Sequence, residues 1–143
     1  MWAYFDTSAL AKRYVAEAGR RDVLQLLRRH EVATSAILPV ELRSALRKRV
    51  AEGALDDRRV RQILGRVATE REYWTLIAVT GDVLAAAEML VAAHPIRALD
   101  AVHVASAQIF RKRLSIADFL FVSADRRQAD AAGAVGMAVR HLA

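Results

Sequence analysis

The sequence predicts an α/β fold, a three-layer sandwich in which helices cover both faces of a central, mostly parallel sheet. Short apolar stretches alternate with longer amphipathic ones along the 143 residues, a pattern typical of parallel strands joined by helices. The stretch 119–122, Phe-Leu-Phe-Val, is continuously apolar, as expected of a strand that is covered on both faces. The length fits one domain, and we expect it to span residues 1–143.

The first segment predicts strand 2–5 followed by helix 8–17, because a short apolar run precedes an amphipathic stretch. Gly19 separates that helix from a second one over 20–30. The short run 32–34, Val-Ala-Thr, is expected to be the next strand.

Pro39 lies near the start of a helix over 39–52, where proline is tolerated because first-turn N–H groups lack partners. Gly53 ends this helix, and apolar residues at helical spacing predict another over 55–73. Residues 74–77, Trp-Thr-Leu-Ile, are expected to be extended.

Thr80 and Gly81 precede a helix that His94 and Pro95 end. The remainder of the chain is expected to contain helices 82–93, 97–113 and 125–133 and strands 119–122 and 138–140.

Composition narrows the possible functions. The chain has no Cys, which excludes disulfides, thiolate metal sites and a cysteine nucleophile. Its net charge is +6, mostly from Arg, and Arg pairs well with phosphate, although an Arg- and Ala-rich composition can also reflect codon usage alone. No apolar run approaches the roughly 18 residues of a membrane span, and no signal peptide is visible. We expect a soluble, cytoplasmic protein.

Four acidic residues occupy equivalent places in the predicted elements. Asp6 and Asp125 follow apolar strands, and Glu41 and Asp100 lie in the first turns of helices. In a parallel sheet all four would meet at the carboxyl edge of the strands, where open α/β sheets bind their ligands. Each one alone is equally explained by helix capping or by the helix dipole, whereas Asp118 precedes its strand and is a reserve candidate.

The four acids together favour a metal site over four independent caps. Two like charges 4 Å apart repel by about 1 kcal/mol in water and about 4 kcal/mol at an effective dielectric of 20, so such a cluster calls for a cation. Oxygen ligands without Cys or a His pair favour a hard ion, Mg²⁺ or alternatively Mn²⁺, over zinc. One or two ions remain open.

Four motifs resemble the PIN-domain ribonucleases, and most closely the VapC toxins of toxin–antitoxin pairs. They are Y-F-D-T-S-A-L at 4–10, P-V-E-L at 39–42, P-I-R-A-L-D-A-V-H-V-A at 95–105 and F-V-S-A-D-R-R-Q at 121–128. The motifs occur in the family's order along the whole chain, while residues 47–93 match in helical pattern more than in identity.

The resemblance implies a PIN-like fold and a catalytic, Mg²⁺-binding quartet of Asp6, Glu41, Asp100 and Asp125. It also implies that Thr7 and Ser123 support the metal or its waters, that the substrate is RNA, and that the protein is a homodimer with a cognate antitoxin. For that partner we expect an exposed apolar groove between the long helices 35–52 and 55–73, formed by residues such as Leu38, Leu46, Val50 and Leu55.

Three further residues keep two interpretations each. His103, three residues after Asp100, is expected to be a packed or capping histidine, with a supporting role in the site as the alternative. Arg43 and Arg47 share a helix face and either meet phosphates or are simply solvated.

The leading hypothesis is a type II toxin that hydrolyses RNA phosphodiester bonds with a metal-activated water. The alternatives are a housekeeping PIN-type RNA-processing nuclease without an antitoxin and a non-catalytic basic RNA-binding module. An aspartyl phosphatase is disfavoured, because the position two residues after Asp6 is Ser8 instead of an acid. A phosphoacceptor domain lacks the expected lysine, since Lys112 lies far along its helix.

Overall fold

The computed structural model describes residues 1–143 and contains one five-stranded sheet in the order β3-β2-β1-β4-β5. Every neighbouring pair of strands is parallel. The strands are β1 (Trp2–Phe5), β2 (Glu31–Ser35), β3 (Thr75–Ile77), β4 (Phe119–Ser123) and β5 (Ala138–His141).

Seven α-helices and one 3₁₀ turn connect the strands. They are α1 (Thr7–Tyr14), α2 (Arg20–Arg29), α3 (Leu38–Ala51), α4 (Asp57–Glu70), the turn η1 (Arg71–Tyr73), α5 (Gly81–Ala93), α6 (Ala98–Arg113) and α7 (Arg126–Ala134). None of the helices has the length and apolarity needed to cross a membrane.

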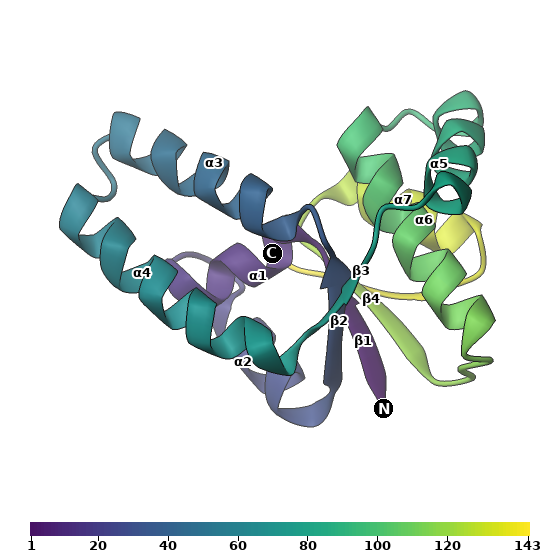
Figure 1. Ribbon diagram of the computed structural model, residues 1–143, viewed down its shortest axis with the longest axis horizontal. Helices are drawn as coiled ribbons and strands as arrows, with labels where there is room; N and C mark the ends of the chain where they lie inside the picture. Colours follow the sequence, from purple (N-terminus) through teal and green to yellow (C-terminus); the bar gives the residue numbers. More distant parts are fainter.

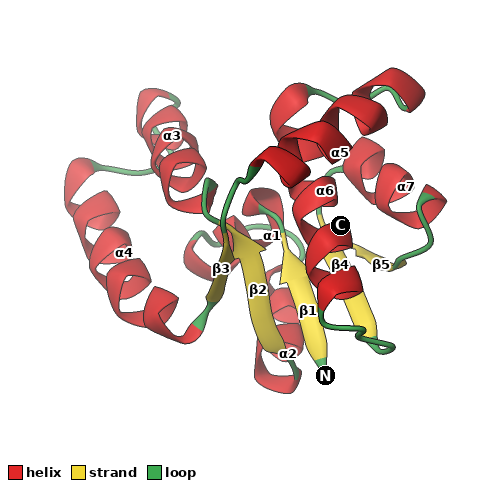
Figure 2. Ribbon diagram, turned by 45° about the vertical axis from the view of Figure 1, so that its right-hand side comes forward, coloured by secondary structure: helices red, strands yellow, loops and turns green.

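Helices lie on both sides of the sheet, so the predicted three-layer arrangement is confirmed. Helices α1 to α4 lie on one side, where α3 and α4 extend outward as a pair, and α5 to α7 lie on the other (Figure 1; Figure 2). The core consists of two clusters, one on each face of the sheet. Alternation along β1 divides its residues between them: Ala3 and Phe5 pack under α1, and Tyr4 packs under α6.

The boundaries of most elements agree with the sequence to within a few residues. The sheet is entirely parallel, which sharpens the expectation of a mostly parallel one. The largest error concerns the first helix, which ends at Tyr14, because Val15 is extended. The Lys12 ammonium donates to the carbonyl of Ala18 at 2.6 Å and thereby holds the following loop against α1.

The expectation of an exposed apolar groove between α3 and α4 is wrong for two of the four residues that were expected to form it. Leu38 and Leu46 are fully buried in the core beside α1, because one face of α3 packs against α1. Val50 and Leu55 are half-buried, and Leu55 borders the same cluster. The apolar surplus of these helices therefore belongs mostly to the protein's own core.

The topology brings the segments that carry the four acids to one edge of the sheet. Strands β1 and β4 are adjacent, with Phe5 paired to Val122, so the residues that follow them are neighbours. Helix α6 leads back to the start of β4 and must therefore begin at the carboxyl edge, as must α3, which follows β2. Both helix starts consequently lie beside the ends of the central strands.

Candidate active site

Asp6 caps a helix and also occupies the centre of this edge. Its carboxylate is buried, and it accepts hydrogen bonds from the Ala9 amide at 2.8 Å and the Ser8 hydroxyl at 2.7 Å on Oδ1. Ser123 Oγ donates to Oδ2 at 2.5 Å. Burial raises the pKa of Asp6 above its ordinary value, although His103 and these hydrogen bonds oppose the shift.

Asp125 repeats the geometry of Asp6 at the neighbouring strand. It follows β4, and its Oδ1 caps α7 by accepting from the Gln128 amide at 3.1 Å. Ser123 Oγ, already bound to Asp6, also accepts from the Asp125 amide at 3.0 Å. One serine hydroxyl therefore links the two strand-end acids, which the sequence placed at the same edge without showing a connection.

Glu41 is held by two side chains from other elements. Its Oε1 accepts from the Thr7 hydroxyl at 2.7 Å and lies 2.5 Å from His103 Nε2. Burial alone would raise the pKa of Glu41, but the hydrogen bond and charge of His103, together with Thr7, lower it overall. Glu41 is therefore ionised at neutral pH.

His103 is packed, as expected, but it also connects the site with the core. Its exposed fraction is 1%, and its Nδ1 lies 2.7 Å from the hydroxyl of the fully buried Tyr4. Since an ionised Glu41 can only accept, His103 donates to it from Nε2. Burial keeps the pKa of Tyr4 well above its ordinary value, so its hydroxyl stays protonated.

Asp100 lies in the first turn of α6, half-exposed at the edge. Gln128 Nε2 donates to its Oδ1 at 3.2 Å, and the guanidinium of Arg97, which is largely solvent-exposed, lies 3.6 Å from its Oδ2. Burial and the nearby charge of Asp125 raise the pKa of Asp100, while Arg97 and His103 lower it less. The mutual repulsion of Asp100 and Asp125 indicates crowded negative charge without a sufficient counter-ion.

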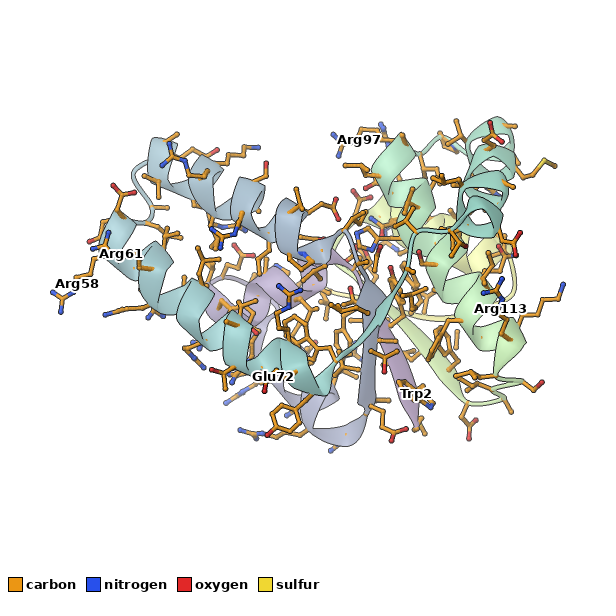
Figure 3. The ribbon with its side chains drawn as sticks, in the orientation of Figure 1. Trp2, Arg58, Arg61, Glu72, Arg97 and Arg113 are labelled. Carbon is orange, nitrogen blue, oxygen red and sulfur yellow. The ribbon has the colours of Figure 1, made fainter.

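All four acids line one open cavity of about 630 Å³. The exposed apolar side chains Val40 and Leu99 border it from α3 and α6. Figure 3 shows Arg97 at the start of α6, on this side of the molecule. The reserve candidate Asp118 is exposed, precedes β4 and does not line the cavity.

The donor set of this cavity fits a hard divalent cation. The acids offer oxygen ligands only, and the buried Oε1 of Gln128 has no hydrogen-bond partner. No three His or acidic side chains are close enough together to form a ready-made cage. Oxygen ligands are the kind that Mg²⁺ takes in proteins, usually one or two carboxylates together with waters.

Several residues at the cavity were not identified from sequence. Ser8 and Gln128 support Asp6 and Asp100, and Lys48 and Arg49 line the cavity from α3. Arg43, for which both a phosphate contact and a solvated face were considered, is exposed on α3 outside the cavity lining, and Arg47 lies 3.9 Å from Asp57. Helical periodicity from Glu41 would have indicated Lys48, which lies two turns further along.

Comparisons with known proteins identify the fold of this chain. A family model described as "PIN domain" matches residues 3–134. A toxin–antitoxin complex from Klebsiella pneumoniae contains a chain with a TM-score of 0.64 and 20% identity, covering 88% of both chains. The crystal structure of FitAcB from Neisseria gonorrhoeae gives a TM-score of 0.65 at 18% identity, covering 96% of this chain and 95% of the other. No curated protein matches by sequence.

Asp100→Asn should stabilise the metal-free protein at neutral pH. Unfolded Asp100 ionises at its ordinary value of 3.8, whereas the folded carboxyl keeps its proton to higher pH, so ionisation destabilises the folded state as pH rises above that value. In a chelator at pH 7 we expect a melting temperature higher by about 2–4 °C, which corresponds to roughly 1 kcal/mol in a domain of this size.

The gain should vanish below the ordinary carboxyl range, where both states of wild-type Asp100 are protonated. Differential scanning fluorimetry across pH measures it, with Asp118→Asn as the control. A variant that melts below wild type at pH 7 in chelator would contradict the crowding of charge at Asp100.

Proposed function

Because the chain belongs to the PIN domain family, whose members are generally nucleases, we propose that it is a Mg²⁺-dependent endoribonuclease and the toxin of a type II toxin–antitoxin pair. One observation carries the catalytic part of the proposal. Four acids from four separate segments line a single cavity at the carboxyl edge of the sheet. The choice of RNA rests on the resemblance of the four motifs to VapC toxins.

Asp6, Glu41, Asp100 and Asp125 would hold the metal, Mg²⁺ or alternatively Mn²⁺. PIN domains typically use divalent metals, and a bound ion supplies a water of lowered pKa and neutralises charge on the phosphoryl oxygens. The ionised Glu41 and the strand-end acids provide the negative charge that such an ion requires.

The chain's other residues hold these acids in place. Ser8, Ser123 and the Ala9 amide orient Asp6, and Gln128 orients Asp100. Thr7 and His103 orient Glu41. Preorganisation of this kind matters because a displacement of about 1 Å in a reacting group can reduce rates by 100-fold.

The toxin role is supported by the fold similarity to two structures described above and by the motif resemblance. Its alternative is a housekeeping nuclease of the same fold without an antitoxin. The proposal includes a homodimer, because Leu84, Met89 and Val91 are exposed on α5, a helix without a basic residue. Sedimentation velocity tests the proposed homodimer. A monomeric protein would contradict the homodimer but not the proposed nuclease activity.

Asp100→Asn should abolish cleavage of single-stranded RNA in Mg²⁺ by at least about 100-fold, because the metal loses a charged ligand. Asp118→Asn is the matched control, since it removes the same charge at the opposite edge of the sheet. Gel assays on a labelled RNA measure both. An Asp100→Asn protein that cleaves at the wild-type rate would falsify the assignment.

Cleavage should leave a 5′-phosphate and a 3′-hydroxyl. Attack by the RNA's own 2′-hydroxyl commonly uses two histidines, but only His103 lines the cavity and both of its ring nitrogens are engaged. A single 2′-deoxy substitution at the cut should therefore be tolerated. Ligation with and without phosphatase treatment identifies the ends, and a 2′,3′-cyclic phosphate formed in EDTA would contradict water attack.

Expression of the protein alone should arrest bacterial growth, and co-expression of the product of an adjacent small gene should restore it. Asp100→Asn should be harmless at equal protein level, because arrest would require cleavage. Growth curves and immunoblots measure both effects. Harmless accumulation of active wild-type protein would favour the housekeeping alternative and leave the nuclease assignment intact.

A further inference from the structure

The cavity that contains the four acids continues along one face of α3. Besides Glu41, this helix contributes Ser44, Ala45, Lys48 and Arg49 to the lining. Positions 41, 44, 45 and 48 follow the three- and four-residue spacing that places side chains on one helical face. At 3.6 residues per turn, Lys48 is rotated only about 20° from Glu41, whereas Arg43 is rotated by about 160°.

The side chains in the middle of this face, Ser44 and Ala45, are small, so no large side chain blocks the face there. Beyond them, Lys48 and Arg49 also line a second open cavity of about 500 Å³, between the end of α1 and the loop that joins α3 to α4. The two cavities therefore adjoin at Lys48 and Arg49. We call the two cavities together the α3 groove; it starts at the acids, and its second half is lined by Glu52 and Arg59 among others.

The two cations at the junction differ in what they already bind. Arg49 donates to both carboxylate oxygens of Glu17, at 3.2 and 3.1 Å, and to the carbonyl of Ala45 at 3.2 Å. Lys48 is exposed and forms no ion pair or side-chain hydrogen bond. An unpaired ammonium in the wall of a groove can bind a phosphate without first breaking an internal contact.

We propose that a single RNA strand runs along this face of α3 and that Lys48 binds one of its phosphates. The proposal rests on the nuclease function above. Lys48 follows Glu41 by seven residues, which is about 10 Å along the helix axis, so it is placed for a neighbouring phosphate and not for the one that is cut. The strand then continues into the second cavity, while the exposed Val40 and Leu99 offer apolar surface to bases at the acidic end.

Lys48→Ala and Arg43→Ala form a matched pair, because each removes one exposed cation from α3 and only Lys48 lines the groove. The probe is a fluorescein-labelled oligouridylate, titrated by anisotropy in Mg²⁺ at several salt concentrations, with Asp100→Asn present in every variant to prevent cleavage. We expect Lys48→Ala to weaken binding about three- to tenfold and to reduce the slope of log Kd against log salt by about 0.7, the value for one phosphate of a single strand. Arg43→Ala should change both far less.

Ser44→Trp tests the course of the strand independently of charge. An indole at this exposed position would fill the groove without disturbing the core, so binding of the oligouridylate should fall, whereas Arg43→Trp should bind like the parent. Thermal melting of each variant controls for folding.

The proposed course of RNA along α3 is overturned if Lys48→Ala and Arg43→Ala have equal effects, or if Ser44→Trp binds normally. In either case the proposed nuclease function stands as long as the wild-type protein cleaves RNA. A wild-type protein that neither binds nor cleaves RNA overturns both. Selective loss in the two groove variants supports the inference.

Discussion

The buried carboxylate of Asp6 is the constraint on which the rest of the site depends. A charge buried at the end of a central strand is costly unless its oxygens are hydrogen-bonded, and three donors from two elements meet that requirement. Two of them start α1 and one ends β4, so the same bonds fix the first helix and the neighbouring strand relative to β1. Asp125 is placed as a consequence, because the serine that binds Asp6 also binds the Asp125 amide.

Glu41 and Asp100 are positioned differently, because the side chain that holds each of them comes from a distant element. His103 joins Glu41 to Tyr4 and hence to the packed core under α6, and Gln128 spans from α7 to Asp100. These contacts keep like charges close together at a cost in apo stability, a trade that is common where function demands strain. In the proposed metal-bound state, a cation in the cavity would relieve the repulsion between Asp100 and Asp125.

Net charge alone does not locate the surface that would meet nucleic acid. Arg58 and Arg61 lie at the start of α4 and point away from the rest of the protein (Figure 3). Five other arginines form ion pairs with acids: Arg13, Arg47, Arg66, Arg113 and Arg140. The informative cation is the one without a partner beside the acids, Lys48. Helix α3 therefore presents Glu41 in its first turn and Lys48 in its third turn on one face, and the proposed metal site and the proposed path of the RNA rest on these two charges.

The sequence by itself determined the α/β class and nearly every strand and helix, because apolar periodicity encodes which face of an element is buried. It also placed the four acids at one edge of the sheet, because a parallel topology brings all strand ends to the same edge. It also located Thr7 and Ser123 by resemblance. Only the tertiary structure decided which side chains meet across that edge: His103 with Glu41, Gln128 with Asp100, and Ser123 with Asp6. The end of α1 at Tyr14 and the burial of Leu38 and Leu46 were likewise decided by packing. Apolar periodicity predicts only which face of its own helix or strand a side chain occupies. These contacts join residues up to 117 positions apart, so they depend on how the layers pack against each other.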